Sequence, residues 1–168
     1  MRILTLLTTT ALIGFASAAF AADKQASANT QHFIEAAANG SEFEVASSKL
    51  ALQKSQNPAV QQFAKQMISD HNKAAKDLKT YVDEAQLNDE LIPAKLDSKH
   101  AAILSQLSTS AGSEFDARYI AAQKDAHREA VTAFDEYAGG GDNREIKDYA
   151  IKTLPTLKQH QAHVEKLK

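Results

Sequence analysis

Four polar side chains interrupt helix faces that are otherwise made of apolar or small residues: Glu44, His71, His127 and His160. The neighbours of His71 in alternating steps of three and four are Val60, Ala64, Met67, Ala74, Leu78 and Tyr81. That spacing is typical of a helix face turned toward a core. The same count places the other two histidines on apolar seams and the glutamate on a seam of small residues. We therefore expect one potential ligand to point inward from each of four helical segments.

A carboxylate and neutral imidazoles that converge in a bundle core are suitable ligands for zinc, copper or iron. Buried polar groups are also commonly satisfied by each other, so Glu44 and His71 could form a charge-assisted pair without a metal. Seam spacing leaves both interpretations open. The first is a metal-binding protein in a stress or metal-handling role, with Glu44, His71, His127 and His160 as ligands. The second is a structural or envelope-interaction module with a metal-free polar core network.

The depth of the four residues along their helices can be compared by counting from the breaks between segments. Glu44 lies 13 residues before Asn57 and His71 lies 14 after it, which places the two level in antiparallel helices. Around the break at 138–143, His127 lies 11 residues before one edge and His160 lies 17 after the other. That offset of six residues corresponds to about 9 Å of helix rise. His160 is therefore the least certain of the four to reach a shared layer.

The chain is predicted to be helical nearly throughout, with no strand-like alternation. Asn57 and Pro58 have the pattern of an N-cap followed by proline at the first helical position. Pro155 is predicted to kink the last helix. The predicted helices lie near 30–55, 58–85, 97–108, 113–138 and 143–167. Their short, long and short connections indicate an all-α, ferritin-like four-helix bundle with a long crossover that contains a short extra helix. An up-down bundle with a helical excursion is the alternative.

Residues beside the four candidate ligands are predicted to play lesser parts. Asp116, Tyr119 and Gln123 lie along the segment that leads to His127 and could support it. Asp70 directly precedes a histidine, but successive helix residues point about 100° apart. Asp70 therefore cannot share the seam that carries His71.

The first 24 residues, MRILTLLTTTALIGFASAAFAADK, have the features of an export signal. Arg2 precedes an apolar stretch, and Ala19-Phe20-Ala21 fits the small-residue rule for signal-peptidase cleavage. The apolar stretch is shorter than the roughly 20 residues that a membrane span requires. We expect a signal peptide at 1–21, a single domain at 22–168, and a periplasmic protein without stable membrane insertion.

Composition excludes several classes of function. The chain has no cysteine, which excludes disulfides and thiolate metal sites. The 19 basic and 21 acidic residues give a net charge of −2, which argues against nucleic acid as a partner. No nucleophile-elbow or glycine-rich phosphate-loop motif is present, so the sequence gives no indication of an enzyme.

Three stretches together resemble the domain of unknown function 4142 family of exported bacterial proteins: FEVASSKLALQKSQNPAVQQFAKQMISDHNKA, FDARYIAAQKDAH and LPTLKQHQAHVEKL. The resemblance implies a ferritin-like bundle and places Glu44, His71, Gln123, His127 and His160 at recurrent polar positions of that family. Di-iron ferritin-like proteins carry Glu-x-x-His pairs, whereas residues 68 and 157, three before two of the histidines, are isoleucine and leucine. Ferroxidase chemistry is therefore not expected.

Overall fold

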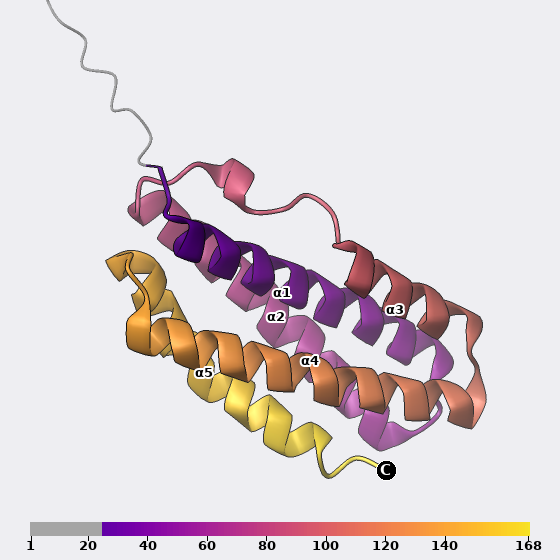
Figure 1. Cartoon of the computed structure of the whole chain (residues 1–168). Helices are drawn as coiled ribbons and strands as arrows, with labels where there is room; N and C mark the ends of the chain where they lie inside the picture. The colour runs from indigo at the N-terminus through magenta and orange to yellow at the C-terminus, as the bar shows by residue number, and fades with distance from the viewer. Residues whose placement is uncertain (1–24) are drawn as a thin grey trace, which may run out of the picture.

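The computed structural model describes residues 25–168, and the predicted signal peptide lies outside them (Figure 1). Its elements are α1 (Ala28–Lys54), α2 (Pro58–Glu84), the 3-10 helix η1 (Asp89–Leu91), α3 (Ser98–Thr109), α4 (Gly112–Gly140) and α5 (Arg144–Val164). Each of the five predicted helices is confirmed, with ends that differ by no more than three residues. No strand is present in the described part of the chain.

Local sequence signals set where the helices begin. The Asn57 side chain accepts a hydrogen bond from the backbone N–H of Ala59, and Pro58 occupies the first helical position. Asn143 caps α5 in the same way, through the N–H of Ile146. These side chains satisfy backbone donors that have no partner inside the first turn of a helix.

The four long helices form a bundle in which α1 packs against α2 and α4, and α5 packs against α4 and α2. Between α2 and α4 the chain returns along the whole length of the bundle, through η1 and α3 (Figure 1). Because of this crossover α2 and α4 run in the same direction, and neighbouring helices in the bundle run antiparallel. The predicted ferritin-like arrangement with one long crossover is confirmed.

The ends of α4 and α5 reduce the offset predicted for His160. α4 continues to Gly140 and α5 begins at Arg144, so His127 lies 13 residues before the turn and His160 lies 16 after it. A difference of three residues corresponds to about 4.5 Å of rise, half of the predicted value. α5 remains helical through Pro155, which lies exposed.

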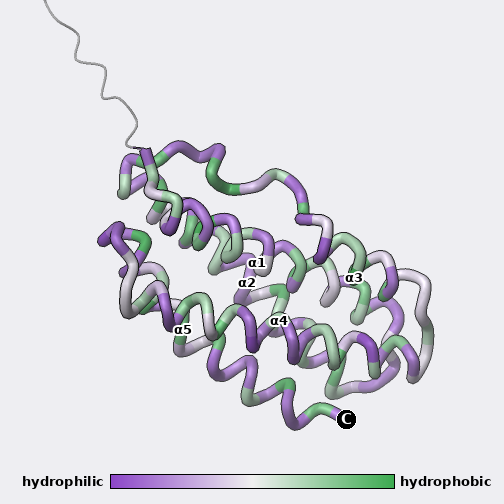
Figure 2. Tube along the Cα trace, viewed as in Figure 1, coloured by the Kyte–Doolittle hydropathy of each residue, from purple (hydrophilic) through white to green (hydrophobic). Residues whose placement is uncertain are grey.

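The core of the bundle contains two apolar clusters. One includes Phe33, Leu78 and Tyr149, and the other includes Phe63 and Met67. Buried polar residues occupy the level between them on every long helix: Glu44, Ser47, Ser48, His71, Gln123, His127 and His160. Figure 2 shows hydrophobic and hydrophilic residues alternating along the helices, as expected for amphipathic elements. The candidate ligands therefore lie in one polar layer at mid-height.

None of the described helices is both long enough and apolar enough to cross a membrane.

Candidate metal centre

Three histidines from three different helices meet in the polar layer. His71 of α2, His127 of α4 and His160 of α5 each offer a ring nitrogen, and these atoms all lie within 4.8 Å of one another. The ring centroids of His71 and His127 are 5.8 Å apart, and each of these rings lies 5.5 Å from His160. All three side chains are buried. His160 thus reaches the shared layer despite the offset of its helix.

Hydrogen bonds fix two of the rings through one nitrogen and leave the other nitrogen of each free. Nδ1 of His127 lies 2.9 Å from the backbone oxygen of Gln123, and Nε2 of His160 lies 2.9 Å from Oδ2 of Asp70. Because both partners are acceptors, these ring nitrogens carry the hydrogens. Nε2 of His127 and Nδ1 of His160 make no hydrogen bond, nor does either nitrogen of His71. Each imidazole therefore keeps a nitrogen with no protein partner.

Burial keeps the three imidazoles in their neutral form. It lowers the pKa of His127 to about 4 and also lowers the pKa of His160. The pKa of His71 lies well below its ordinary value because of burial and the two neighbouring histidines. A neutral imidazole has the lone pair that binds a metal, whereas an imidazolium does not. At neutral pH the cluster is therefore chemically competent to act as a ligand set.

Glu44, on α1, lies beside the cluster but is not one of the converging ligands. Its Oε1 is 3.5 Å from Nδ1 of His127, and neither carboxyl oxygen has a hydrogen-bond partner. Burial raises the pKa of Glu44 to about 8. The expected contact with His71 is replaced by one with His127, and near neutral pH this contact joins two uncharged groups. It is therefore not the charge-assisted pair considered from the sequence.

The supporting residues differ in part from those predicted. Gln123 supports His127 through its backbone oxygen, and its side-chain amide donates to Oγ of Ser47 at 3.1 Å. The Tyr119 hydroxyl lies 2.8 Å from Oγ of Ser48, in the wall of the same layer. Asp116 makes no hydrogen bond to these groups.

Asp70 lies off the seam that carries His71, as predicted, but it contacts the site from another side. The 100° separation keeps Asp70 off the seam of α2 that carries His71, and it turns the carboxylate toward α5 instead. There it accepts from His160, whose ring comes from a different helix. Counting along one helix could not reveal this contact, because it depends on which helix lies beside α2.

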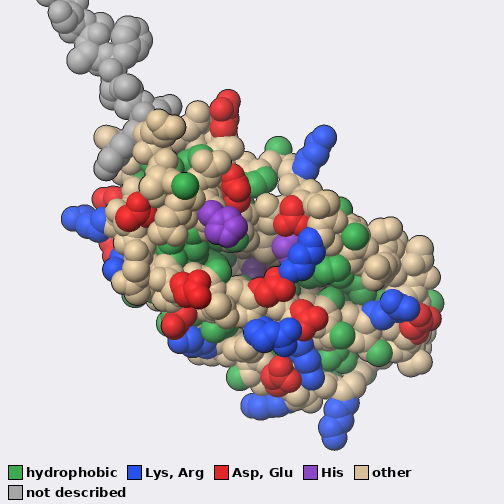
Figure 3. Space-filling view, viewed as in Figure 1, with side chains coloured by type: hydrophobic (Ala, Val, Ile, Leu, Met, Phe, Trp, Pro, Cys, Tyr) green, Lys and Arg blue, Asp and Glu red, His purple; other side chains and the backbone are tan. Residues whose placement is uncertain are grey.

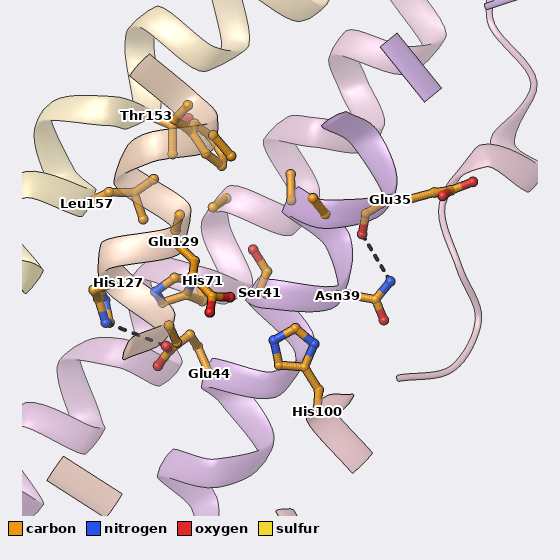
Figure 4. A pocket seen from close by; sticks show the side chains of 18 of the residues that line it. Glu35, Asn39, Ser41, Glu44, His71, His100, His127, Glu129, Thr153 and Leu157 are labelled. Carbon is orange, nitrogen blue, oxygen red and sulfur yellow. Dashed lines mark hydrogen bonds and ion pairs between the residues drawn. The ribbon is translucent and has the colours of Figure 1, made fainter. Parts of the chain in front are cut away.

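A cavity of about 370 Å³ connects this layer with the surface. His71, His127 and Glu44 lie at its inner end, and Figure 4 shows their side chains grouped together on one side of the pocket. Lys99 and Glu129, which form an ion pair between α3 and α4, lie among its outer residues. Figure 3 shows the hollow in this face of the molecule, with histidine side chains visible in it. The cluster is buried but can be approached from outside.

The sequence profile of the family described as "Domain of unknown function (DUF4142)" matches residues 15–167. The chain belongs to the DUF4142 family. No curated protein matches this DUF4142 chain.

Two solved structures resemble the fold of this DUF4142 protein. One is a DUF305 fragment from Deinococcus radiodurans, with 14% identity, a TM-score of 0.70, and coverage of 84% of this chain and 96% of the fragment. The other is CopM in the Cu(II)-bound form, with 20% identity, a TM-score of 0.66, and coverage of 82% of this chain and 93% of CopM. At these identities the likeness concerns the fold.

Proposed function

We propose that this DUF4142 protein binds a divalent transition-metal ion through His71, His127 and His160. The observation that carries the proposal is the convergence of three buried, neutral imidazoles, each with a ring nitrogen that no protein group satisfies. Buried polar groups in native proteins nearly always have a partner, because leaving one unpaired costs about 1–3 kcal/mol. A metal ion at the centre would satisfy all three nitrogens at once.

The arrangement supports a metal ion more strongly than a metal-free polar network. In such a network the imidazoles would hydrogen-bond to one another or to Glu44, as donors and acceptors. Here the three rings make no hydrogen bonds among themselves, and Glu44 approaches His127 to 3.5 Å without forming a hydrogen bond. The bonds that do exist run from His127 to the backbone oxygen of Gln123 and from His160 to Asp70, and each holds one nitrogen of its ring, which is how metal-bound histidines are usually oriented.

The ligand type limits which metal the site would bind. Neutral imidazoles suit zinc, copper, nickel and iron, and affinity for a given site rises along the series to Cu²⁺ and falls again at Zn²⁺. We expect Cu²⁺ to bind most tightly, with Zn²⁺ weaker than Cu²⁺. The likeness of the fold to a protein described in a Cu(II)-bound form agrees with this order. Three imidazoles suffice for the proposal, with Glu44 close by as a further oxygen donor.

We further propose that the protein works in the periplasm, in metal handling or stress. The support is the export signal predicted at 1–21. N-terminal mass spectrometry of the periplasmic fraction should find a chain that starts at or within one residue of Ala22. A chain that retains Met1 in the membrane fraction would contradict the export proposal.

Metal binding can be tested on untagged protein by elemental analysis and by equilibrium competition with a chelator of known affinity. We expect one Cu²⁺ or Zn²⁺ per chain, and loss of that ion in His71→Leu while the helical circular dichroism is unchanged. His32→Leu is the matched control, because His32 is exposed and outside the cluster. If the wild-type chain binds no metal with its three histidines intact, the alternative function is favoured: a structural or envelope-interaction module whose core holds a metal-free polar network.

A further inference from the structure

The cavity beside the histidine cluster is built mostly from small residues. Ala37, Gly40, Ala74, Ala130 and Ala133 are among those that line it, and they leave open space where a bundle core normally holds larger side chains. At about 370 Å³ the cavity lies within the size range of small-molecule sites. It is therefore large enough for an organic molecule and much larger than a single water requires.

The inner end of the cavity carries polar atoms that have no protein partner. They are both carboxyl oxygens of Glu44, both nitrogens of His71 and Nε2 of His127. These side chains are between 1% and 5% exposed. His160, the third member of the cluster, does not line the cavity. The cluster therefore presents two of its three rings and a free carboxyl group to the cavity.

Three protein ligands leave a coordination position open at a tetrahedral ion, as in catalytic rather than structural zinc sites. We infer that the fourth position of the metal faces this cavity and takes a small, uncharged azole-type heterocycle from solution. This inference rests on the proposed function and deepens it, because it names the class of molecule that the metal site would accept. It distinguishes an open site from a closed site that only stores a metal.

The lining of the cavity favours an uncharged organic ligand over a small anion. Lys99 is the only lysine or arginine among the lining residues, and it is already paired with Glu129. An anion would therefore be held by the charge of the metal ion alone, whereas an organic molecule would also bury apolar surface against the cavity walls. An azole offers a ring nitrogen to the metal and an N–H group to the nearby oxygens of Glu44. Its apolar body would lie along the alanine-rich walls.

The inference can be tested with 4-phenylimidazole as the probe on Co²⁺-loaded protein. The visible spectrum of Co²⁺ changes when a ligand enters its coordination shell. We expect a saturable spectral change in the wild-type chain, and a much weaker response to sodium azide. Equilibrium dialysis is used first to show that Co²⁺ is bound, so that failure of the metal site and failure of the open position give different results.

Gly40→Leu provides a variant that fills the cavity without touching a ligand. A Cβ added at Gly40 meets no atom within 4 Å, and the residue lies inside α1. Gly139→Leu is the matched control, since it also lies in a helix with no atom within 4 Å of an added Cβ, but outside the cavity. We expect Gly40→Leu to weaken 4-phenylimidazole binding at least about tenfold through steric exclusion. Co²⁺ affinity should be unchanged in both variants.

Three results would overturn the inference. The first is a Co²⁺-loaded wild-type chain whose spectrum does not respond to 4-phenylimidazole. The second is an equal response in Gly40→Leu and Gly139→Leu. The third is tighter binding of azide than of the azole, which would assign the position to anions. If dialysis detects no bound Co²⁺, Zn²⁺ or Cu²⁺, the proposed function itself fails, and this inference fails with it.

Discussion

The two ring nitrogens of each clustered histidine have different surroundings. In His127 and His160 one nitrogen is hydrogen-bonded and the other is free, while in His71 both are free. Hydrogen-bond partners of this kind fix the tautomer and the orientation of a metal-binding ring, and their removal usually weakens metal binding 10–100-fold. His71 is held by packing alone. The metal affinity of the site therefore depends on residues that do not themselves bind the metal.

Asp70 is the clearest example, and its removal gives the first prediction. Asp70→Ala takes away the acceptor 2.9 Å from Nε2 of His160 and leaves the ring free to turn. We expect metal affinity to fall by roughly 10–100-fold, with the fold unchanged. Competition titration with a chelator measures the change. Asp83→Ala, on an exposed position of the same helix, should leave the affinity as it is. Equal affinities in the two variants would show that the Asp70 contact does not orient the ring.

A second prediction concerns the pH dependence of stability in the metal-free protein. The pKa of His127 is lowered to about 4 in the folded chain, so the stability present above about pH 6.5 is lost as the pH falls toward 4. The pKa of Glu44 is raised to about 8, so the stability present below about pH 4.5 is lost as the pH rises toward 8. His71 and His160 shift in the same direction as His127, so the histidines dominate on the acid side.

Melting temperatures measured across this range should therefore pass through a maximum near about pH 6 to 6.5. Glu44→Gln removes the group that titrates between the maximum and about pH 8, and its melting temperature should stay level there. A wild-type curve that keeps rising from pH 6.5 to 8 would contradict the raised pKa of Glu44. A Glu44→Gln curve that falls as steeply as the wild-type curve would assign the loss to another group.

At the scale of elements, the helices could be predicted because their signals are local. Each signal is contained in one short stretch of sequence. Examples are the cap at Asn57, the glycine run before Asn143 and the seam around His71, which lies within a single helix. The η1 helix was not predicted, because three residues carry too little periodicity. The sequence predicts an end of α4 at residue 138, because glycine is a weak helix former. In the structure Gly139 and Gly140 continue the helix for two more residues.

The site could be predicted as a set of inward-facing residues but not as a geometry. Seam counting predicts that Glu44, His71, His127 and His160 face the core, and all four are buried there. It leaves His160 offset from the layer that this residue in fact reaches. It could not show that the carboxyl group lies beside His127, nor that Asp70 reaches His160. Those contacts depend on the rotation and neighbours of packed helices, which the sequence of one helix does not contain.

The turn between α4 and α5 gives a third prediction, because it sets the register of His127 against His160. A Cβ added at Gly141 would lie 2.5 Å from both the backbone oxygen and a ring carbon of Tyr137. Gly141→Ala should therefore destabilise the chain by roughly 1–3 kcal/mol, as overpacking does. Gly139→Ala, which meets no atom within 4 Å, should be neutral or slightly stabilising. Urea unfolding measures both changes, and equal midpoints for the two variants would show that the turn adjusts freely.

At the scale of the whole molecule, the polar layer divides the core into two apolar clusters, and its histidine cluster joins three of the four long helices. His71, His127 and His160 come from α2, α4 and α5, which are distant in sequence. Without a metal, this level of the bundle holds buried polar atoms with no partner. An ion at the centre would replace that unfavourable layer with a cross-link, so metal binding should be coupled to the stability of the entire domain.

This coupling gives the last prediction. A ligand that binds only the folded chain stabilises it by about 2.7 kcal/mol at a free concentration 100 times its dissociation constant. In a domain of this size that corresponds to an increase in melting temperature of roughly 5–10 °C.

The increase can be measured by differential scanning calorimetry with Zn²⁺, which avoids the redox chemistry of copper. We expect the increase in the wild-type chain, its reversal by a chelator, and no increase in His71→Leu. Acidification to about pH 4, where His127 becomes protonated in the folded chain, should also abolish it, because protons then compete with the metal for the imidazoles. An equal increase in His71→Leu would show that the stabilising ion binds elsewhere, and the histidine cluster would then not be the metal centre.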